Sequence, residues 1–341
     1  MLEVKIKGTR GNPSAQYQFD AGPGITAIVG PSGAGKTSLL RVIAGLDHPV
    51  SGTISLGGIA MPQRAEHRQI GMVFQEPRLL PHYTVQQNIE LGRSGVISAK
   101  QLADQLGISD LIERFPHSLS GGEKQRVMIG RALFGAPKLM LFDEPLSAID
   151  PRLKADLLTL IRTHFAQANI PVLYVTHQME EAAQLAQNLI AIDQGKIVAQ
   201  GPLAQTMAQL DGPAFFENGI TSLLSGTVTA IDAEFDLATI GVGAQHVDLP
   251  RKALNVGDQV RLRIWARDVL LSKKRLEGVS ARNQLQGEIE TIRLFDRSQA
   301  DVLVRVEGEI VRARVMAKTI ADLQMVVGQS TYVVFKSASV E

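Results

Sequence analysis

Residues 30–37 read Gly30-Pro31-Ser32-Gly33-Ala34-Gly35-Lys36-Thr37, which matches the phosphate-binding pattern G-x-x-x-x-G-K-[ST]. The apolar run Ile25–Val29 before it predicts a buried strand, and apolar residues after it recur at helical spacing. Strand, glycine loop and helix in this order favour a loop that binds polyphosphate through backbone N–H groups over an ordinary turn. All eight residues are therefore candidate nucleotide-binding residues, with Lys36 reaching the β- and γ-phosphates and the Thr37 hydroxyl binding Mg²⁺.

The composition of the 341-residue chain limits the kinds of partner and site that we expect. The net charge is +1, so no general attraction to nucleic acid is predicted. The chain has no cysteine, which excludes disulfides and thiolate metal sites. No apolar run approaches the roughly 18 residues of a membrane-spanning helix, and Met1–Gly8 lacks the apolar core of a signal peptide. We therefore expect any role at a membrane to depend on a partner protein.

Residues 1–218 alternate strand and helix patterns, which is typical of an α/β domain with a largely parallel sheet. Residues 2–7 alternate apolar and charged side chains as an edge strand does, and a second alternating segment carries Tyr17 and Phe19. Residues 84–134 look helical, which predicts a helical subdomain at about 78–134. Further strands are predicted at 51–56, 71–75, 139–142 and 172–175, followed by a hairpin over 189–199.

Residues 219–341 show short alternating segments separated by glycine turns, the pattern of an all-β domain. The segment Gly226–Ile231 resembles Gly287–Ile292, and a Val-Gly pair precedes an alternating strand in both halves. This weak repeat predicts two small OB-like barrel modules of five strands each, at about 222–272 and 279–341. The alternative is one irregular β domain in which the similarity is due to chance.

Polar side chains follow the predicted strands at the end where ligands bind in open α/β sheets. Gln75 ends one strand, where its amide can bind Mg²⁺ and the attacking water. Asp143 and Glu144 follow the next apolar strand; the first can hold Mg²⁺ and the second can polarise the water. His177 ends a later strand, where it can meet the γ-phosphate. Each residue alone has an ordinary structural explanation, but their order along the chain favours a catalytic site.

A further run, Leu119-Ser120-Gly121-Gly122-Glu123-Lys124-Gln125, precedes a predicted helix and can present N–H groups and a hydroxyl to an anion. Taken with the loop, the catalytic candidates and the turn at Asp150, it makes residues 1 to about 215 resemble the nucleotide-binding subunit of ABC transporters. The resemblance implies a P-loop NTPase fold of the ABC type, with ATP and Mg²⁺ bound. It also implies a homodimer in which Ser120, Gly121, Gly122 and Gln125 of one subunit face the nucleotide of the other, beside Asp150.

Two further expectations follow from this resemblance. The region Pro77–Glu90 corresponds to the surface that contacts the membrane permease, and it carries Leu79, Leu80, Pro81 and Tyr83. The alternative for these apolar residues is the core of the helical subdomain itself. Members of the family stack an aromatic residue on adenine, but residues 11–15 contain none. Either Tyr17 or Phe19 substitutes for it, or the base is held more loosely.

Two runs in the last module, Val279–Gln284 and Phe335–Val340, resemble the molybdate-binding module of storage proteins and of molybdate importer ATPases. A tetrahedral oxyanion needs hydroxyl and N–H donors together with cations. The first module has Trp265-Ala266-Arg267-Asp268 at the matching place, so we expect one type of site per chain. The alternative is that the charged residues decorate a barrel rim. The candidate donors are Ser280, Arg282, Asn283, Lys336 and Ser337.

Together the resemblances imply the ATP-hydrolysing subunit of a molybdate or tungstate importer at the cytoplasmic face of the inner membrane. It would serve two copies of a transmembrane permease, fed by a periplasmic molybdate-binding protein, and molybdate could act on it as a regulatory ligand. Importers of sulfate, sugars or polyamines are the alternative within the class, because their ATPases also carry C-terminal β modules. Alternatives from other classes are a soluble ABC ATPase and an oxyanion-storage protein.

Overall fold

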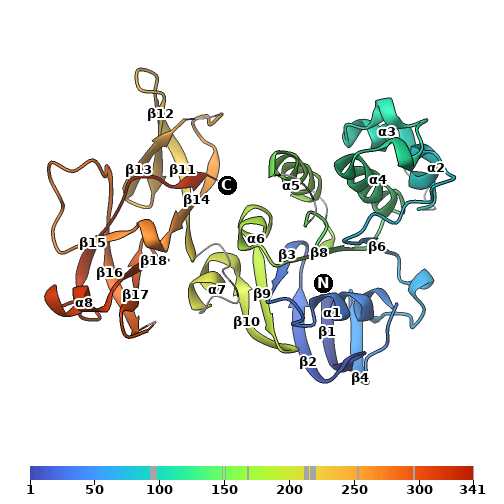
Figure 1. Cartoon of the computed structure of the whole chain (residues 1–341), viewed down its shortest axis with the longest axis horizontal. Helices are drawn as coiled ribbons and strands as arrows, with labels where there is room; N and C mark the ends of the chain where they lie inside the picture. Colours follow the sequence, from blue (N-terminus) through green and yellow to red (C-terminus); the bar gives the residue numbers. More distant parts are fainter. Residues whose placement is uncertain are drawn as a thin grey trace. The chain divides into compact units, whose positions relative to one another are not determined.

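The computed structural model describes residues 1–341 except 93–97, 148, 150, 167–168, 211–214, 216–219, 252, 295 and 341, and the side chains of 151, 152 and 166. It divides into two compact units, Met1–Gly201 and Pro202–Glu341, which we describe separately (Figure 1). The sequence suggested a boundary at 218, but helix α7 (Leu203–Gln209) packs on strands of the second unit. Within the described part of the chain, no helix is long and apolar enough to cross a membrane.

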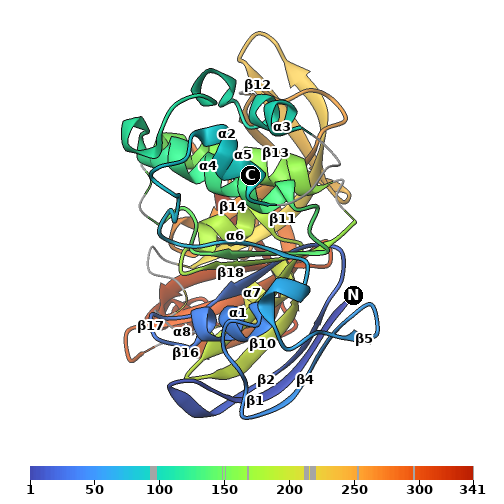
Figure 2. The same ribbon diagram turned by 90° about the vertical axis from the view of Figure 1, so that its right-hand side faces the viewer.

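The first unit is built on a ten-stranded sheet with the order β5-β4-β1-β2-β10-β9-β3-β8-β7-β6. Strands β6, β7, β8, β3 and β9 run parallel. Strands β4, β1 and β2, which Figure 2 labels, pair antiparallel on the other side of β10. The mixed sheet confirms the predicted α/β fold. The strands are β1 (Leu2–Thr9), β2 (Asn12–Ala21), β3 (Gly24–Val29), β4 (Ser51–Leu56), β5 (Ile59–Ala60), β6 (Ile70–Val73), β7 (Leu139–Asp143), β8 (Pro171–Thr176), β9 (Asn188–Asp193) and β10 (Lys196–Pro202).

The prediction that residues 2–7 form an edge strand is wrong, because β1 lies between β2 and β4. Its side chains alternate: Leu2, Val4 and Ile6 are buried, and the charged residues between them face outward. Such alternation reports that one face of a strand is solvated, which an internal antiparallel strand also shows. The pattern therefore identifies the strand but not its place in the sheet.

Helices of the first unit fall into two groups. Helix α1 follows the glycine loop and buries Leu39, Leu40 and Ile43 in the core formed with the sheet. Helices α2, α3 and α4 gather in one cluster (Figure 1), and each begins with a capping box, at Thr84, Ser98 and Ser120. The helices are α1 (Lys36–Ala44), α2 (Val85–Glu90), α3 (Ala99–Gln105), α4 (Gly121–Phe134), α5 (Pro151–Ala166) and α6 (Met179–Leu185), with 3₁₀ turns at Ala65–His67, Ser109–Leu111 and Pro116–Ser118.

The second unit consists of two five-stranded sheets, ordered β13-β12-β11-β14-β20 and β15-β19-β16-β17-β18. It also holds helix α8 (Ala317–Asp322) and a 3₁₀ turn at Ala266–Asp268. The all-β prediction for this part of the chain is confirmed. Its strands are β11 (Thr221–Asp232), β12 (Leu237–Val242), β13 (Gln245–Pro250), β14 (Gln259–Trp265), β15 (Leu270–Ser272), β16 (Asn283–Leu294), β17 (Gln299–Val306), β18 (Glu309–Met316), β19 (Ser330–Phe335) and β20 (Ser339–Val340).

The two sheets exchange their shortest strands. Strand β15 is the last segment of the first module in sequence but pairs with β19 of the second sheet, and β20 at the end of the chain pairs with β14 of the first. Apolar side chains from both sheets also form one core cluster, for example Leu262 with Leu285. The modules are therefore interlocked, which strands of two or three residues are too short to reveal by periodicity.

The internal repeat is structural rather than a chance similarity. The pairing of β11 with β12 is bulged between Val228 and Ala230, and that of β16 with β17 is bulged between Ile289 and Thr291. The repeated glycine-turn hydrogen bonds also match, since Gly257 donates to the Val228 carbonyl and Gly328 to the Ile289 carbonyl. Equal bulges at equal positions indicate one supersecondary unit used twice.

Candidate functional site

The glycine loop leaves β3 and closes around a buried lysine. A Cβ atom at Gly30 would lie 2.1 Å from the Ile192 carbonyl oxygen, so this position accepts only glycine. Gly35 has φ +102° and begins α1 in the left-handed conformation. The Lys36 side chain is 4% exposed, and its Nζ donates to the carbonyl oxygens of Gly30 at 2.8 Å and Pro31 at 3.0 Å. The loop thus holds its own cation at its centre.

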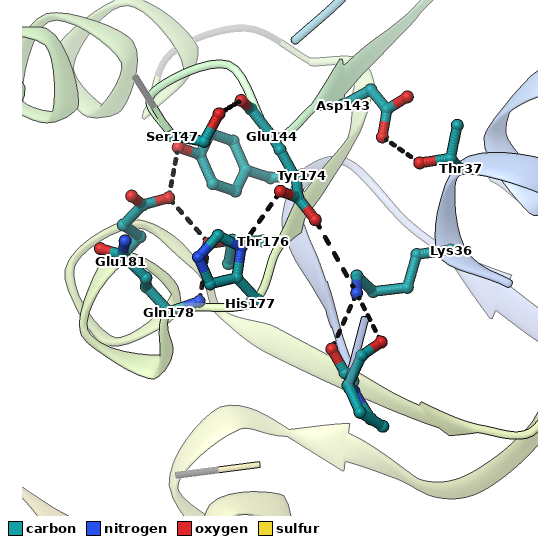
Figure 3. Close-up of polar contacts among 12 residues, drawn as sticks. Lys36, Thr37, Asp143, Glu144, Ser147, Tyr174, Thr176, His177, Gln178 and Glu181 are labelled. Carbon is teal, nitrogen blue, oxygen red and sulfur yellow. Dashed lines mark hydrogen bonds and ion pairs between the residues drawn. The ribbon is translucent and has the colours of Figure 1, made fainter. Parts of the chain in front are cut away.

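A pair of oxygens lies beside the loop. The Thr37 hydroxyl donates to Asp143 Oδ1 over 2.9 Å, which joins the start of α1 to the carboxyl end of β7 (Figure 3). Burial raises the pKa of Asp143, and the adjacent Glu144 adds to this, while the Thr37 hydrogen bond and Lys36 oppose it. A hydroxyl and a carboxylate are oxygen ligands of the kind that Mg²⁺ shares with substrate phosphates. These two residues therefore fit the predicted Mg²⁺ site.

Glu144 is held in an uncommon backbone conformation. Its φ is +45°, in the left-handed region, and its N–H donates to the Val175 carbonyl at 3.0 Å. Its carboxylate lies between two nitrogen atoms: Oε1 is 3.8 Å from Lys36 Nζ, and Oε2 is 3.1 Å from His177 Nδ1 (Figure 3). The structure thus brings together the three predicted site residues Lys36, Glu144 and His177. A strained residue with a charged side chain between two such partners is typical of a functional site.

Gln75 lies two residues beyond β6, which ends at Val73 rather than at the predicted glutamine. In the parallel pairing of β6 with β7, Val73 lies opposite Phe142, so Gln75 follows the same edge of the sheet as Asp143. Its side chain is exposed. The role in binding Mg²⁺ and the attacking water stays a prediction.

Ser120 is the N-cap of α4, as predicted, and its hydroxyl and N–H both lie 2.7 Å from Glu123 Oε2. These hydrogen bonds lower the pKa of Glu123. Ser120 and Gly121 are exposed, whereas a Cβ atom at Gly122 would lie 1.9 Å from Leu153, so Gly122 permits close packing of α4 on α5. Gln125 is 1% exposed, so its side chain is buried within its own subunit. Asp150 lies outside the described residues.

Neither Tyr17 nor Phe19 is available to stack on adenine. Both point into the core from β2 and are at most 3% exposed, because alternate side chains of that strand face the helices. The Tyr17 hydroxyl donates to the Gly35 carbonyl at 3.4 Å, and burial raises its pKa. Tyr17 therefore supports the glycine loop from within the core. Neither Tyr17 nor Phe19 takes the place of the aromatic residue that stacks on adenine in the family.

The segment before α2 presents partly apolar side chains on a turn held by a buried asparagine. The predicted contact residues Leu79, Leu80, Pro81 and Tyr83 are half-buried or exposed, so none belongs to a closed core. Asn88 is fully buried; its Oδ1 accepts from the Leu80 N–H at 2.8 Å, and its Nδ2 donates to the carbonyls of Leu80, Tyr83 and Thr84. The sequence reasoning missed this residue, since a single asparagine in a helix carries no pattern.

The two candidate oxyanion runs meet in the second sheet. Asn283 lies opposite Phe335 in the pairing of β16 with β19, and its Nδ2 donates to the Lys336 carbonyl at 3.3 Å. The same amide exchanges hydrogen bonds with the backbone of Asp248, so its polar atoms are committed to the protein. Arg282 donates to Asp248 Oδ2 at 3.2 Å. Ser280, Lys336 and Ser337 are exposed.

Asp248 is the residue at this place that sequence reasoning missed. It comes from β13, in the first module, so the runs of the second module do not form the site alone. A cavity of about 410 Å³ opens beside the ion pair of Arg282 and Asp248. Its walls also include Thr229, Asp232, Leu237, Thr239 and His246.

Comparisons with known proteins show which family the chain resembles. The ABC transporter family profile matches residues 16–147, and the TOBE domain profile matches residues 279–341. The molybdenum import ATP-binding protein ModC of Rhizobium etli is 36% identical over 353 residues, covering 100% of this chain and 99% of the relative. That of Mesorhizobium japonicum is 37% identical, covering 99% and 95%. The dimeric structure of MJ0796, a bacterial ABC transporter cassette, is 25% identical over 60% of this chain and 99% of that one, with a TM-score of 0.52.

Proposed function

Because the chain belongs to the molybdenum import ATP-binding proteins of the ABC transporter family, we propose that it is the ATP-hydrolysing subunit of a molybdate importer. The observation that carries the enzymatic part is the position of the Glu144 carboxylate, between Lys36 of the glycine loop and His177. A passive oxyanion-storage protein has no use for such a site. Tungstate shares the tetrahedral chemistry of molybdate and is a second substrate of the same kind.

The chain's own residues divide the work at the ATP site. The loop 30–37 and Lys36 would bind the phosphates. Thr37 and Asp143, which lie together, would hold a Mg²⁺ ion with Gln75, and the ion would offset phosphate charge. Glu144 takes up a proton from the attacking water as general base. His177 lies against Oε2 of Glu144, so its Nδ1 fixes the carboxylate and its other ring nitrogen is left to meet the γ-phosphate.

The assembly follows from the exposed end of α4. Ser120 and Gly121 lie at the surface, where they can reach the nucleotide held by the second subunit of a homodimer. The half-buried apolar segment around Leu79 and Tyr83 is the surface that we assign to the permease, of which two copies complete the transporter. The dimer then lies peripherally on the cytoplasmic face of the inner membrane, and a periplasmic molybdate-binding protein delivers substrate from the other side.

The C-terminal module is the basis for choosing molybdate over sulfate, sugars or polyamines. Arg282 and Lys336 supply cationic donors, and Ser280 and Ser337 supply hydroxyls, within the region that matches the TOBE domain. Molybdate bound there from the cytoplasm acts as a regulatory ligand. Asn283 contributes by fixing the loop at Lys336 rather than by donating to the anion.

The test is hydrolysis by the complete transporter in vesicles, with its permease and its binding protein. Molybdate-loaded binding protein should stimulate ATP hydrolysis, and the Lys36→Ala variant should not respond because it lacks the phosphate-binding cation. Equal stimulation by sulfate-loaded protein would remove the substrate assignment while leaving the ATPase in place. Absence of ATP-dependent stimulation by any substrate would contradict the importer function.

A further inference from the structure

A buried carboxylate lies behind the catalytic residues and has no part in the mechanism above. Glu181 on α6 is 3% exposed. Its Oε2 accepts from the Tyr174 hydroxyl and from the Thr176 hydroxyl, each at 2.9 Å (Figure 3). Its Oε1 accepts from Lys154 Nζ at 2.8 Å. Burying a charge is unfavourable unless it is paired and hydrogen-bonded, so these three donors are what keep the carboxylate in place.

The same network forms hydrogen bonds with both residues next to His177 in the chain. Thr176, just before it, donates to Glu181, and its hydroxyl oxygen accepts from the Gln178 N–H at 3.0 Å. Gln178, just after it, accepts from Lys154 Nζ through its side-chain oxygen at 2.8 Å. The backbone on each side of the histidine is therefore tied to the Glu181–Lys154 ion pair. His177 has little freedom to shift unless one of these hydrogen bonds breaks.

The Glu181–Lys154 ion pair joins two helices that are separate in sequence, α5 and α6. Lys154 lies in the first turns of α5, which begins at Pro151, and Glu181 lies on α6, which follows His177. On the site side, His177 Nδ1 is 3.1 Å from Glu144 Oε2. A change at Glu181 would thus reach Glu144 in two steps, first through Thr176 to the backbone of His177 and then through the imidazole of His177.

We propose that Glu181 is a positioning residue for ATP hydrolysis. Through Thr176, and through Lys154 and Gln178, it fixes the imidazole of His177 against the Glu144 carboxylate. Glu181 itself touches neither the glycine loop nor the oxygen pair of Thr37 and Asp143 in the described contacts. The inference rests on the proposed ATPase function and adds to it a residue that lies outside the reacting centre.

The competing explanation is that the ion pair only joins α5 to α6 and stabilises the fold. A purely structural pair would lower the unfolding temperature of its variants but leave the turnover of the folded protein unchanged. A positioning pair lowers kcat while leaving the KM for ATP unchanged, because the glycine loop is untouched. The two explanations therefore differ in the separation of kcat from KM.

The variants are Glu181→Gln, Tyr174→Phe and Lys154→Met in the complete transporter, measured well below their unfolding temperatures. A catalytic acid–base group contributes typically about 10²- to 10⁴-fold, so its misplacement should cost at least about 10-fold in kcat. Lys154→Arg should restore most of the rate because it keeps a cationic donor. Asp156→Asn is the matched control: it removes one carboxylate from the exposed face of α5 and should behave as wild type.

Two further measurements distinguish action through His177 from a general loss. Adding Glu181→Gln to His177→Ala should cause no further decrease in kcat, whereas an additional decrease of the full size would overturn the proposal. The ¹⁵N chemical shifts of the His177 ring should differ between wild type and Glu181→Gln, and unchanged shifts would overturn it independently of residual activity. If Glu144→Gln abolishes turnover but Glu181→Gln leaves kcat unchanged, the positioning role fails and the ATPase function stands.

Discussion

Replacing Glu144 by glutamine is the sharpest test of the catalytic geometry. The amide has nearly the shape of the carboxylate, and the left-handed backbone at this position, with φ +45°, makes the same demand on both residues. The change removes the negative charge that lies 3.8 Å from Lys36 Nζ and 3.1 Å from His177 Nδ1. The glycine loop, the Thr37–Asp143 pair and the backbone hydrogen bond to Val175 should remain.

The size of the effect follows from the loss of the general base. Such a group contributes typically about 10²- to 10⁴-fold, which at 1.36 kcal/mol per factor of ten is about 3–5 kcal/mol. The neighbouring carboxylate of Asp143 is hydrogen-bonded to Thr37 and cannot replace it without breaking that contact. We therefore expect kcat to fall by about 10³-fold, while the KM for ATP stays within about 3-fold.

The assay is phosphate release by the assembled transporter, with ATP binding measured separately on the same preparation. The variant should bind ATP and accumulate as an ATP-bound dimer, detectable by its elution volume. Ser147→Ala is the control, because it removes only a hydrogen bond to the Glu144 carbonyl and keeps the carboxylate. Turnover of Glu144→Gln within about 10-fold of wild type would refute the role of this residue.

Three more outcomes follow from the described contacts. Subunits with Lys36→Ala and subunits with Ser120→Arg should each be inactive alone but regain activity when mixed. In the mixed dimer both substitutions fall in one ATP site, and the other site is intact. No recovery on mixing would exclude head-to-tail sites. Burial raises the pKa of Asp143, so the folded state favours its protonated form, and the stability that this form contributes is lost as the pH rises through that pKa. Asp143→Asn should therefore raise the unfolding temperature at neutral pH while weakening Mg²⁺-dependent ATP binding. A lower unfolding temperature would show that the ionised form is not disfavoured. Molybdate should inhibit the assembled ATPase, and ATP should weaken molybdate binding by the same factor of roughly 5 to 150, or about 1–3 kcal/mol. The double variant Arg282→Ala with Lys336→Ala should abolish the inhibition. If the ATPase rate does not change across a molybdate titration, although binding is established separately, feedback is excluded.

The residues that could be predicted from the sequence are those with local patterns. The glycine loop, the strand before it and the helix after it depend on neighbouring residues, and they appear where expected. The carboxylates at the end of β7 and the histidine after β8 could also be predicted, because each follows an apolar run in the sequence. Because parallel strands end at one edge of a sheet, the apolar runs alone are enough to place these polar residues in a common site.

The features that escaped prediction depend on side-chain contacts that follow no helical or strand spacing in the sequence. Glu181 lies in a run of polar and small residues that resembles a solvated helix face, yet it is buried because Tyr174, Thr176 and Lys154 converge on it. Asn283 resembles an oxyanion ligand by its position in a motif, but the backbone of Asp248 occupies its amide. In both cases the residues that form the hydrogen bonds cannot be identified from the sequence pattern.

The interlocked C-terminal sheets bear on how bound molybdate could change the protein. Arg282 is paired with Asp248 of the first module, and Asn283 joins Asp248 to the loop at Lys336. An anion that attracts Arg282 competes with the Asp248 carboxylate, so its binding alters a contact between the two modules. The exchanged strands β15 and β20 and the shared core resist independent movement of either sheet. A small shift at the anion site must therefore be absorbed by the unit as a whole, which is the property that a regulatory module requires.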